Sequence, residues 1–106
     1  MKKFVFVKSG KSIIKINIDD IVVIQGLGNY TQVHTIDLKK LTYYNSLRGL
    51  IDNLPKEFMR VHNSYIINLN HIDKIENNHI YLIKHKVPIS LSKKKYLQIA
   101  INEYSL

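Results

Sequence analysis

The sequence contains no cysteine among its 106 residues. This absence excludes disulfide bonds, thiolate nucleophiles and thiolate metal sites together, so the core alone must stabilise the fold. Long apolar runs are also missing, because no stretch approaches the roughly 20 residues that span a membrane, and the N-terminal apolar stretch is too short for a signal peptide. We therefore expect a cytoplasmic protein without membrane insertion. A chain of this length buries one modest core, which predicts a single domain over residues 1–106.

Acidic residues are few, with eight Asp plus Glu against sixteen Lys plus Arg, and the net charge is +8 at pH 7. A domain this basic attracts polyanions, of which nucleic acid is the commonest in a cytoplasm. The alternative is a generic lysine-rich surface. The imbalance is local, however, because residues 77–102 hold no acidic residue and five lysines, which we interpret as one patch: Lys84, Lys86, Lys93, Lys94 and Lys95.

Short segments rich in β-branched and aromatic residues fill the first half of the chain. The expected elements are a hairpin over residues 4–18 that turns at Ser9-Gly10, a strand over 19–27 that is buried on both faces, a turn at 26–29, a strand over 30–36, a turn at 37–40 and a strand over 41–45. In the strand over 30–36, Tyr30, Gln32 and His34 share one face.

Apolar residues at helical spacing predict two short helices. In residues 46–54 they recur at i, i+3, i+4 and i+7 before Pro55 ends the helix. The second helix is expected over residues 92–106, with Ser92 as its N-cap. Since strands outnumber these helices, we predict a compact, mainly β domain.

Two further strand regions lie between the predicted helices. Residues 71–85 predict two strands around an Asn77-Asn78 turn. Residues 86–92 predict another strand, and Pro88 favours an edge position or a strand start for it.

Segment 58–72, FMRVHNSYIINLNHI, has the composition of a strand but gathers polar side chains in its middle. Asn63 interrupts the apolar face of a regular strand, so either the strand ends near His62 or Asn63 lies at a bend. An asparagine that projects from a bend can pair with an adenine edge in the major groove, while arginine, here Arg60, suits guanine or phosphate. The alternative is that both side chains only bind loop backbone.

Three lysines occupy the first turn of the second predicted helix, where the macrodipole is positive and each cation costs roughly 0.3–1 kcal/mol. An anion bound at this end would reverse that cost. Free N–H groups, Ser92 and the ammonium groups of Lys93, Lys94 and Lys95 would then converge on one phosphate-sized target. The alternative is that these lysines simply point into water.

Catalytic and metal-binding interpretations are weaker. His62 and Ser64 suggest a Ser–His hydrolase, but they lack neighbouring glycines for the turn that exposes a nucleophile. Residues 26–29 contain G-x-G but lead into a strand, which favours a turn over a phosphate loop. The five histidines lack metal-binding spacing: His34, His62, His71, His79 and His85. We expect no enzymatic activity, no cofactor and no metal ion.

The central segment strongly resembles the signature of the LytTR DNA-binding domain, an Arg-x-His-[Arg or Asn]-Ser-[Tyr or Phe] run followed by an apolar pair and Asn. Residues 19–35 resemble the family's strand, turn and strand, and residues 47–64 its amphipathic helix leading into the signature. Residues 87–96 resemble its closing strand with a serine and basic residues. The similarity spans nearly all of the chain.

The resemblance implies a bacterial transcription regulator built of small antiparallel β-sheets packed side by side, which reaches DNA through loops rather than a recognition helix. It implies double-stranded DNA as the partner, bound at direct repeats on successive major-groove faces by two domains per site, as a homodimer on the DNA. Family members usually carry a receiver or a membrane segment before this domain. Neither is present here, so we expect a free-standing regulator or an excised output domain whose sensing partner is missing from this chain.

Carried over by position, the implied DNA-binding residues are Asn29, Tyr30, Arg60, Asn63, Ser92, Lys93, Lys94 and Lys95. Lysines stand where many members have arginine, which favours phosphate contact over bidentate contact with guanine. Which of the three lysines contacts a base stays open. The main alternative is a basic β module that binds single-stranded RNA by stacking bases on tyrosines, namely Tyr43, Tyr44 and Tyr81.

Overall fold

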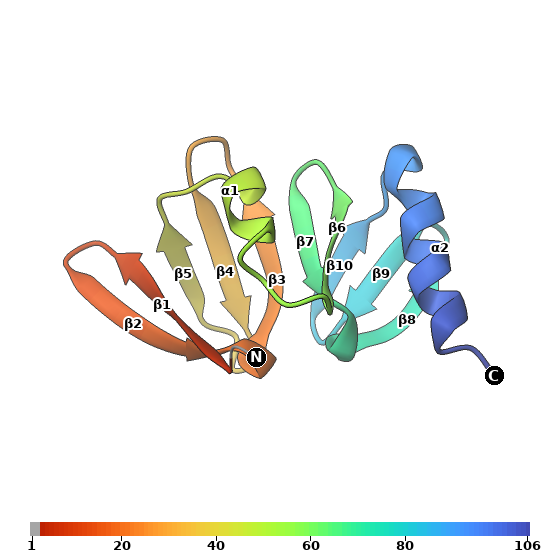
Figure 1. The fold of residues 1–106 in the computed structure, drawn as a ribbon, viewed down its shortest axis with the longest axis horizontal. Helices are drawn as coiled ribbons and strands as arrows, with labels where there is room; N and C mark the ends of the chain where they lie inside the picture. The colour runs from red at the N-terminus through yellow and green to blue at the C-terminus, as the bar shows by residue number, and fades with distance from the viewer. Residues whose placement is uncertain (1–2) are drawn as a thin grey trace.

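Ten β-strands in three antiparallel sheets form the framework of the computed structural model, which describes residues 3–106. The sheets stand side by side along the long axis of the molecule (Figure 1), whose extents are 44 × 26 × 25 Å. This arrangement confirms the mainly β fold of small antiparallel sheets with two short helices. The elements in chain order are β1 (Phe4–Ser9), β2 (Ser12–Asn17), η1 (Ile18–Asp20), β3 (Ile21–Gly26), β4 (Thr31–Thr35), β5 (Lys40–Tyr43), α1 (Leu47–Ile51), β6 (Phe58–His62), β7 (Tyr65–Asn68), η2 (Leu69–His71), β8 (Ile72–Glu76), β9 (His79–Leu82), β10 (His85–Pro88), η3 (Leu91–Lys93) and α2 (Lys94–Glu103).

The central sheet, of strand order β5-β4-β3-β7-β6, separates two hydrophobic cores. Ile24 and Ile66, which pair across β3 and β7, lie in a core with α1 and the β1–β2 hairpin. Val23 and Ile67, the next pair, lie in a core with the β8–β9–β10 sheet and α2. Each face of β3 packs on one of the two cores. Polar residues at every second position of this strand would therefore be buried on one of its faces. The predicted burial of this strand on both faces is confirmed.

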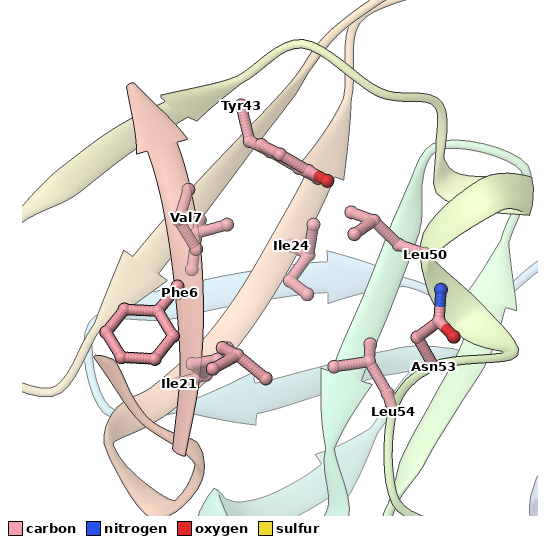
Figure 2. Close-up of a pocket in the computed structure, with 10 residues that line it drawn as sticks. Phe6, Val7, Ile21, Ile24, Tyr43, Leu50, Asn53 and Leu54 are labelled. Carbon is pink, nitrogen blue, oxygen red and sulfur yellow. The ribbon is translucent and has the colours of Figure 1, made fainter. Parts of the chain in front are cut away.

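The β1–β2 hairpin forms a sheet of its own and packs against the first core. A pocket of about 120 Å³ lies between β1, β3 and the residues of and after α1. Figure 2 shows Val7, Ile24 and Leu50 directed into this pocket, while the ring of Phe6 points away from it. Its lining is mostly apolar, which makes it part of the packing between hairpin and sheet.

Tight turns join most neighbouring strands. The expected Asn77-Asn78 turn is confirmed, because Glu76 pairs with His79 and both asparagines have positive φ, 52° and 62°. A second turn of this kind, between β9 and β10, does not show in the sequence because Ile83 has a φ of 52°, which a β-branched residue rarely adopts. The Asp73 carboxylate accepts a hydrogen bond from the Ile83 N–H at 2.8 Å and so stabilises the turn.

Both helices begin and end differently from the sequence-based expectation. The first is only Leu47–Ile51, with Ser46 Oγ accepting from the Gly49 N–H at 3.2 Å as its N-cap. The prediction that Ser92 caps the second helix is wrong. A 3₁₀ turn precedes that helix, in which the Lys93 N–H donates to Ser90 O at 3.1 Å, so Lys93 occupies the N-cap position without a side-chain cap bond. The edge position expected for the Pro88 strand is confirmed, since β10 is the outer strand of its sheet.

Candidate nucleic-acid interface

Four connecting segments meet at one edge of the molecule, the upper edge in Figure 1. We call residues 26–30, 44–46, 63–64 and 90–95 together the loop edge. Backbone hydrogen bonds join neighbouring segments, because Gly26 N–H donates to Ser64 O at 2.8 Å and Ser90 N–H donates to Val61 O at 2.9 Å. The loop edge thereby brings together seven of the eight residues that the resemblance implied, and the eighth, Arg60, lies beside it in β6.

Asn63 and Ser64 form the two-residue turn between β6 and β7, whose end residues His62 and Tyr65 pair with each other. The expected interruption of the strand at this point is confirmed. His62 Nδ1 accepts from the Ser64 N–H at 3.0 Å, which holds one side of the turn. The Asn63 side chain is exposed and hydrogen-bonds to no other residue within the described range 3–106. Its donor and acceptor are therefore available to a ligand.

Arg60, in the neighbouring strand β6, stabilises the same turn. Its Nη2 donates to Asn63 O at 2.8 Å, and its Nε is buried without a partner among the described residues. A charge-assisted bond to a carbonyl is stronger than a neutral one, so it fixes the backbone that carries the Asn63 amide. The alternative reading of Arg60, in which it binds loop backbone, describes this contact.

The β3–β4 loop carries Asn29, which is exposed, and Tyr30, which is half-buried. Gly28 has a φ of 80°, which only glycine adopts readily, and Leu27 N–H donates to Tyr30 O at 2.9 Å to close the loop. The ring of Tyr30 lies 5.9 Å from that of Tyr44, which is 73% exposed. Tyr44 was missed as a residue of this edge, because its contact with Tyr30 joins two loops that only tertiary structure brings together.

The loop edge is positive and free of acid groups. Lys94 and Lys95 are exposed and Lys93 is half-buried at the start of α2. All eight acidic residues of the chain lie outside the loop-edge segments. The salt bridges of the described residues pair Lys39 with Asp37 and Lys74 with Glu76, so none engages these three lysines.

The interpretation of five lysines as one patch is wrong. Lys84 lies in the turn before β10 and Lys86 near the start of that strand, whereas the other three lysines follow the end of β10. Figure 1 shows the start of β10 near the lower edge of the molecule and the start of α2 at its upper edge. Sequence proximity misled here because a strand separates its ends along its full length.

The structure does not support the two alternative functions, a Ser–His hydrolase and a module that binds single-stranded RNA. His62 contacts the backbone of Ser64 and, among the described residues, does not bond its hydroxyl, so no Ser–His pair is assembled. The three tyrosines of the RNA alternative lie apart: Tyr43 lines the pocket of Figure 2, Tyr44 lies on the loop edge, and Tyr81 in β9 contacts Lys74 and Lys86.

Within residues 3–106, no group of three or more His, Asp or Glu side chains is placed to hold a metal ion. None of the helices described there has the length and apolarity needed to cross a bilayer.

Comparison with known proteins agrees with this geometry. Residues 11–102 match the family model of the LytTr DNA-binding domain. The sensory transduction proteins LytT of Bacillus anthracis and Bacillus cereus are each 37% identical over 95 residues, an alignment that covers 83% of this chain and 38% of theirs. The chain thus spans well under half the length of these curated relatives.

A solved structure shares the fold over almost its full length. It is described as the LytTr DNA-binding domain of a methyl-accepting/DNA response regulator from Bacillus cereus, and it is 27% identical in sequence. The TM-score is 0.79, with 95% of this chain and 98% of the other covered. The chain belongs to the LytTR family, whose members are DNA-binding domains and not enzymes.

Proposed function

We propose that this domain regulates transcription in a bacterial cytoplasm by binding duplex DNA at a specific sequence through the loop edge. The observation that carries the proposal is the exposed Asn63 amide, held on a braced turn at the same acid-free edge as Lys93 to Lys95. Cations that lack acidic partners can neutralise phosphates, and a fixed amide can pair with a base edge.

The roles divide by chemistry. Phosphate contacts, which position the domain without selecting sequence, come from Lys93, Lys95 and Ser92 at the start of α2. Asn63 supplies most of the direct readout in the major groove, with Tyr30 and Lys94 in support and Asn29 beside them. Arg60 contributes by fixing the Asn63 turn and by adding positive charge next to the groove.

The dimensions of the molecule suit a duplex. Its longest extent is 44 Å, and the loop edge runs along that axis. One turn of B-DNA is about 34 Å, so two domains side by side on a direct repeat could occupy successive major grooves. Two domains on a direct repeat, as a homodimer on the DNA, would double the contacts. A receiver or membrane partner would supply the signal to such an output domain.

The test begins with selection of bound sites from random duplexes, which should return one motif repeated at fixed spacing and a complex with two domains. Asn63→Ala should then lose about 1–3 kcal/mol of discrimination between selected and random duplex, with the salt dependence unchanged. Lys93→Ala should weaken both duplexes equally and lower the slope of log K against log salt by about 1.

Other outcomes would contradict the proposal. Equal losses on both duplexes for Asn63→Ala would remove its role as a base contact. A full salt slope for Lys93→Ala would exclude a phosphate contact there. Preference for single-stranded RNA over duplex DNA in competition at one salt concentration would replace the function itself.

A further inference from the structure

Leu91 is 89% exposed, more than any other large apolar residue in the described range except the terminal Leu106. It lies in η3, within the loop edge and two residues before Lys93. A single exposed leucine is ordinary on a protein surface. Its position is the informative feature, because it projects from the surface that we propose faces DNA.

The backbone under Leu91 is anchored on both sides. Ser90 N–H donates to Val61 O at 2.9 Å, and Lys93 N–H donates to Ser90 O at 3.1 Å. The hydroxyls of Ser90 and Ser92 lie 3.4 Å apart, so the two polar neighbours bond to each other. Because the turn is already fixed, its backbone loses little conformational entropy when a ligand covers the Leu91 side chain. The small entropy cost favours a contact that forms only in a complex.

The surroundings of Leu91 decide what covers it. Three lysines follow it and no acidic residue lies on the loop edge, so the same edge of a second copy would be repelled. A duplex attracts this charge, and the apolar group that its major groove offers is the C5-methyl of thymine.

We propose that Leu91 contacts a thymine C5-methyl group and thereby selects a T·A pair at one position of the site, an inference that rests on the proposed function. The bond between Ser90 and Val61 joins the Leu91 turn to the strand end that carries Asn63. The thymine therefore lies near the base that Asn63 contacts. Lys93 and Lys95 then contact phosphates of the DNA backbone near this pair.

The test uses the selected duplex with its thymines replaced one at a time by deoxyuridine, which keeps base pairing and removes only the methyl group. At one thymine position the wild-type Kd should rise about fourfold, the effect of one buried methyl of about 0.8 kcal/mol. Leu91→Ala should bind the thymine and deoxyuridine duplexes equally. Ile99→Ala, which truncates an exposed aliphatic side chain farther along α2, should keep the fourfold difference.

The possible results distinguish failure of the Leu91 contact from failure of DNA binding itself. If Leu91→Ala keeps the whole methyl effect, or if no thymine methyl matters to the wild type, Leu91 does not select thymine although the domain still binds its site. If the wild type shows no preference for any duplex sequence, the proposed function fails as well. The urea midpoint of Leu91→Ala should equal that of the wild type, because the side chain is exposed.

Discussion

At the scale of the residue, the polar side chains of segment 58–72 have different tasks that composition does not distinguish. Asn63 is exposed and available to a ligand, whereas Asn68 is fully buried. Asn68 Nδ2 donates to Ile21 O at 2.9 Å, and its Oδ1 accepts from the Asn70 N–H at 3.0 Å. One asparagine thus serves the interface and the other joins β7 to β3.

Asn68→Ala should lower the free energy of unfolding by about 1–3 kcal/mol, because it removes the side-chain donor to the buried Ile21 carbonyl and the acceptor of the Asn70 N–H. Asn70→Ala is the matched control, since Asn70 is exposed and its backbone N–H is kept; a change within about 0.5 kcal/mol is expected. Urea denaturation measures both. Equal effects of the two substitutions would show that the buried bonds contribute no net stability.

At the scale of the element, α2 combines a stabilising core contact with a destabilising first turn. Leu97 is buried in the second core, which anchors the helix. Its first turn, however, carries Lys94 and Lys95, and no side chain caps it. The positive end of the helix dipole therefore lies beside positive charges. This arrangement destabilises the helix in the free protein and favours binding of an anion at this end.

Lys94→Glu should therefore stabilise the free protein by about 1 kcal/mol and weaken its binding to every duplex. Lys11→Glu, in the exposed turn of the β1–β2 hairpin, makes the same change in net charge away from the loop edge. It should shift stability less and DNA affinity less. Thermal unfolding and salt titrations of binding measure the two effects, and identical behaviour of the two variants would mean that only net charge matters.

The elements also show where sequence patterns are sufficient. The buried β3 strand, the Asn77-Asn78 turn and the break at Asn63 follow from local residue types and were predicted correctly. The turn at Ile83 was not, because Asp73, ten positions earlier, stabilises it. The start of α2 differed because η3 is joined to Val61 of β6, a distant contact.

At the scale of the whole molecule, two histidines meet where the central sheet approaches the third one. His34 of β4 and His85 of β10 contact each other edge to face, with ring centroids 4.9 Å apart. Burial lowers the pKa of His34 below its ordinary 6.5, and His85 and Lys40 lower it further. Burial also lowers the pKa of His85. Both rings are thus held neutral between the two sheets.

Stability should therefore fall as the pH falls from 6.5 through these lowered values, because the unfolded chain takes up protons first. Well above pH 6.5 both histidines are neutral in the folded and the unfolded state, and the effect is absent. Urea denaturation at about pH 7.5 and about pH 5 should show a smaller loss for a His34→Gln/His85→Gln variant than for the wild type. The same loss in both proteins would assign the pH dependence to other groups.

The sequence by itself determined the class of fold, the family and the chemical types at the interface, since periodicity, turn residues and the signature segment are local properties of the chain. Only the tertiary structure decided which polar groups remain available. It buried Asn68, turned Arg60 onto the Asn63 backbone, separated Lys84 from Lys93 and brought Tyr44 to Tyr30. The physical reason is that hydrogen bonds and burial depend on neighbours from other strands, and strand order is set by long-range packing into the two cores.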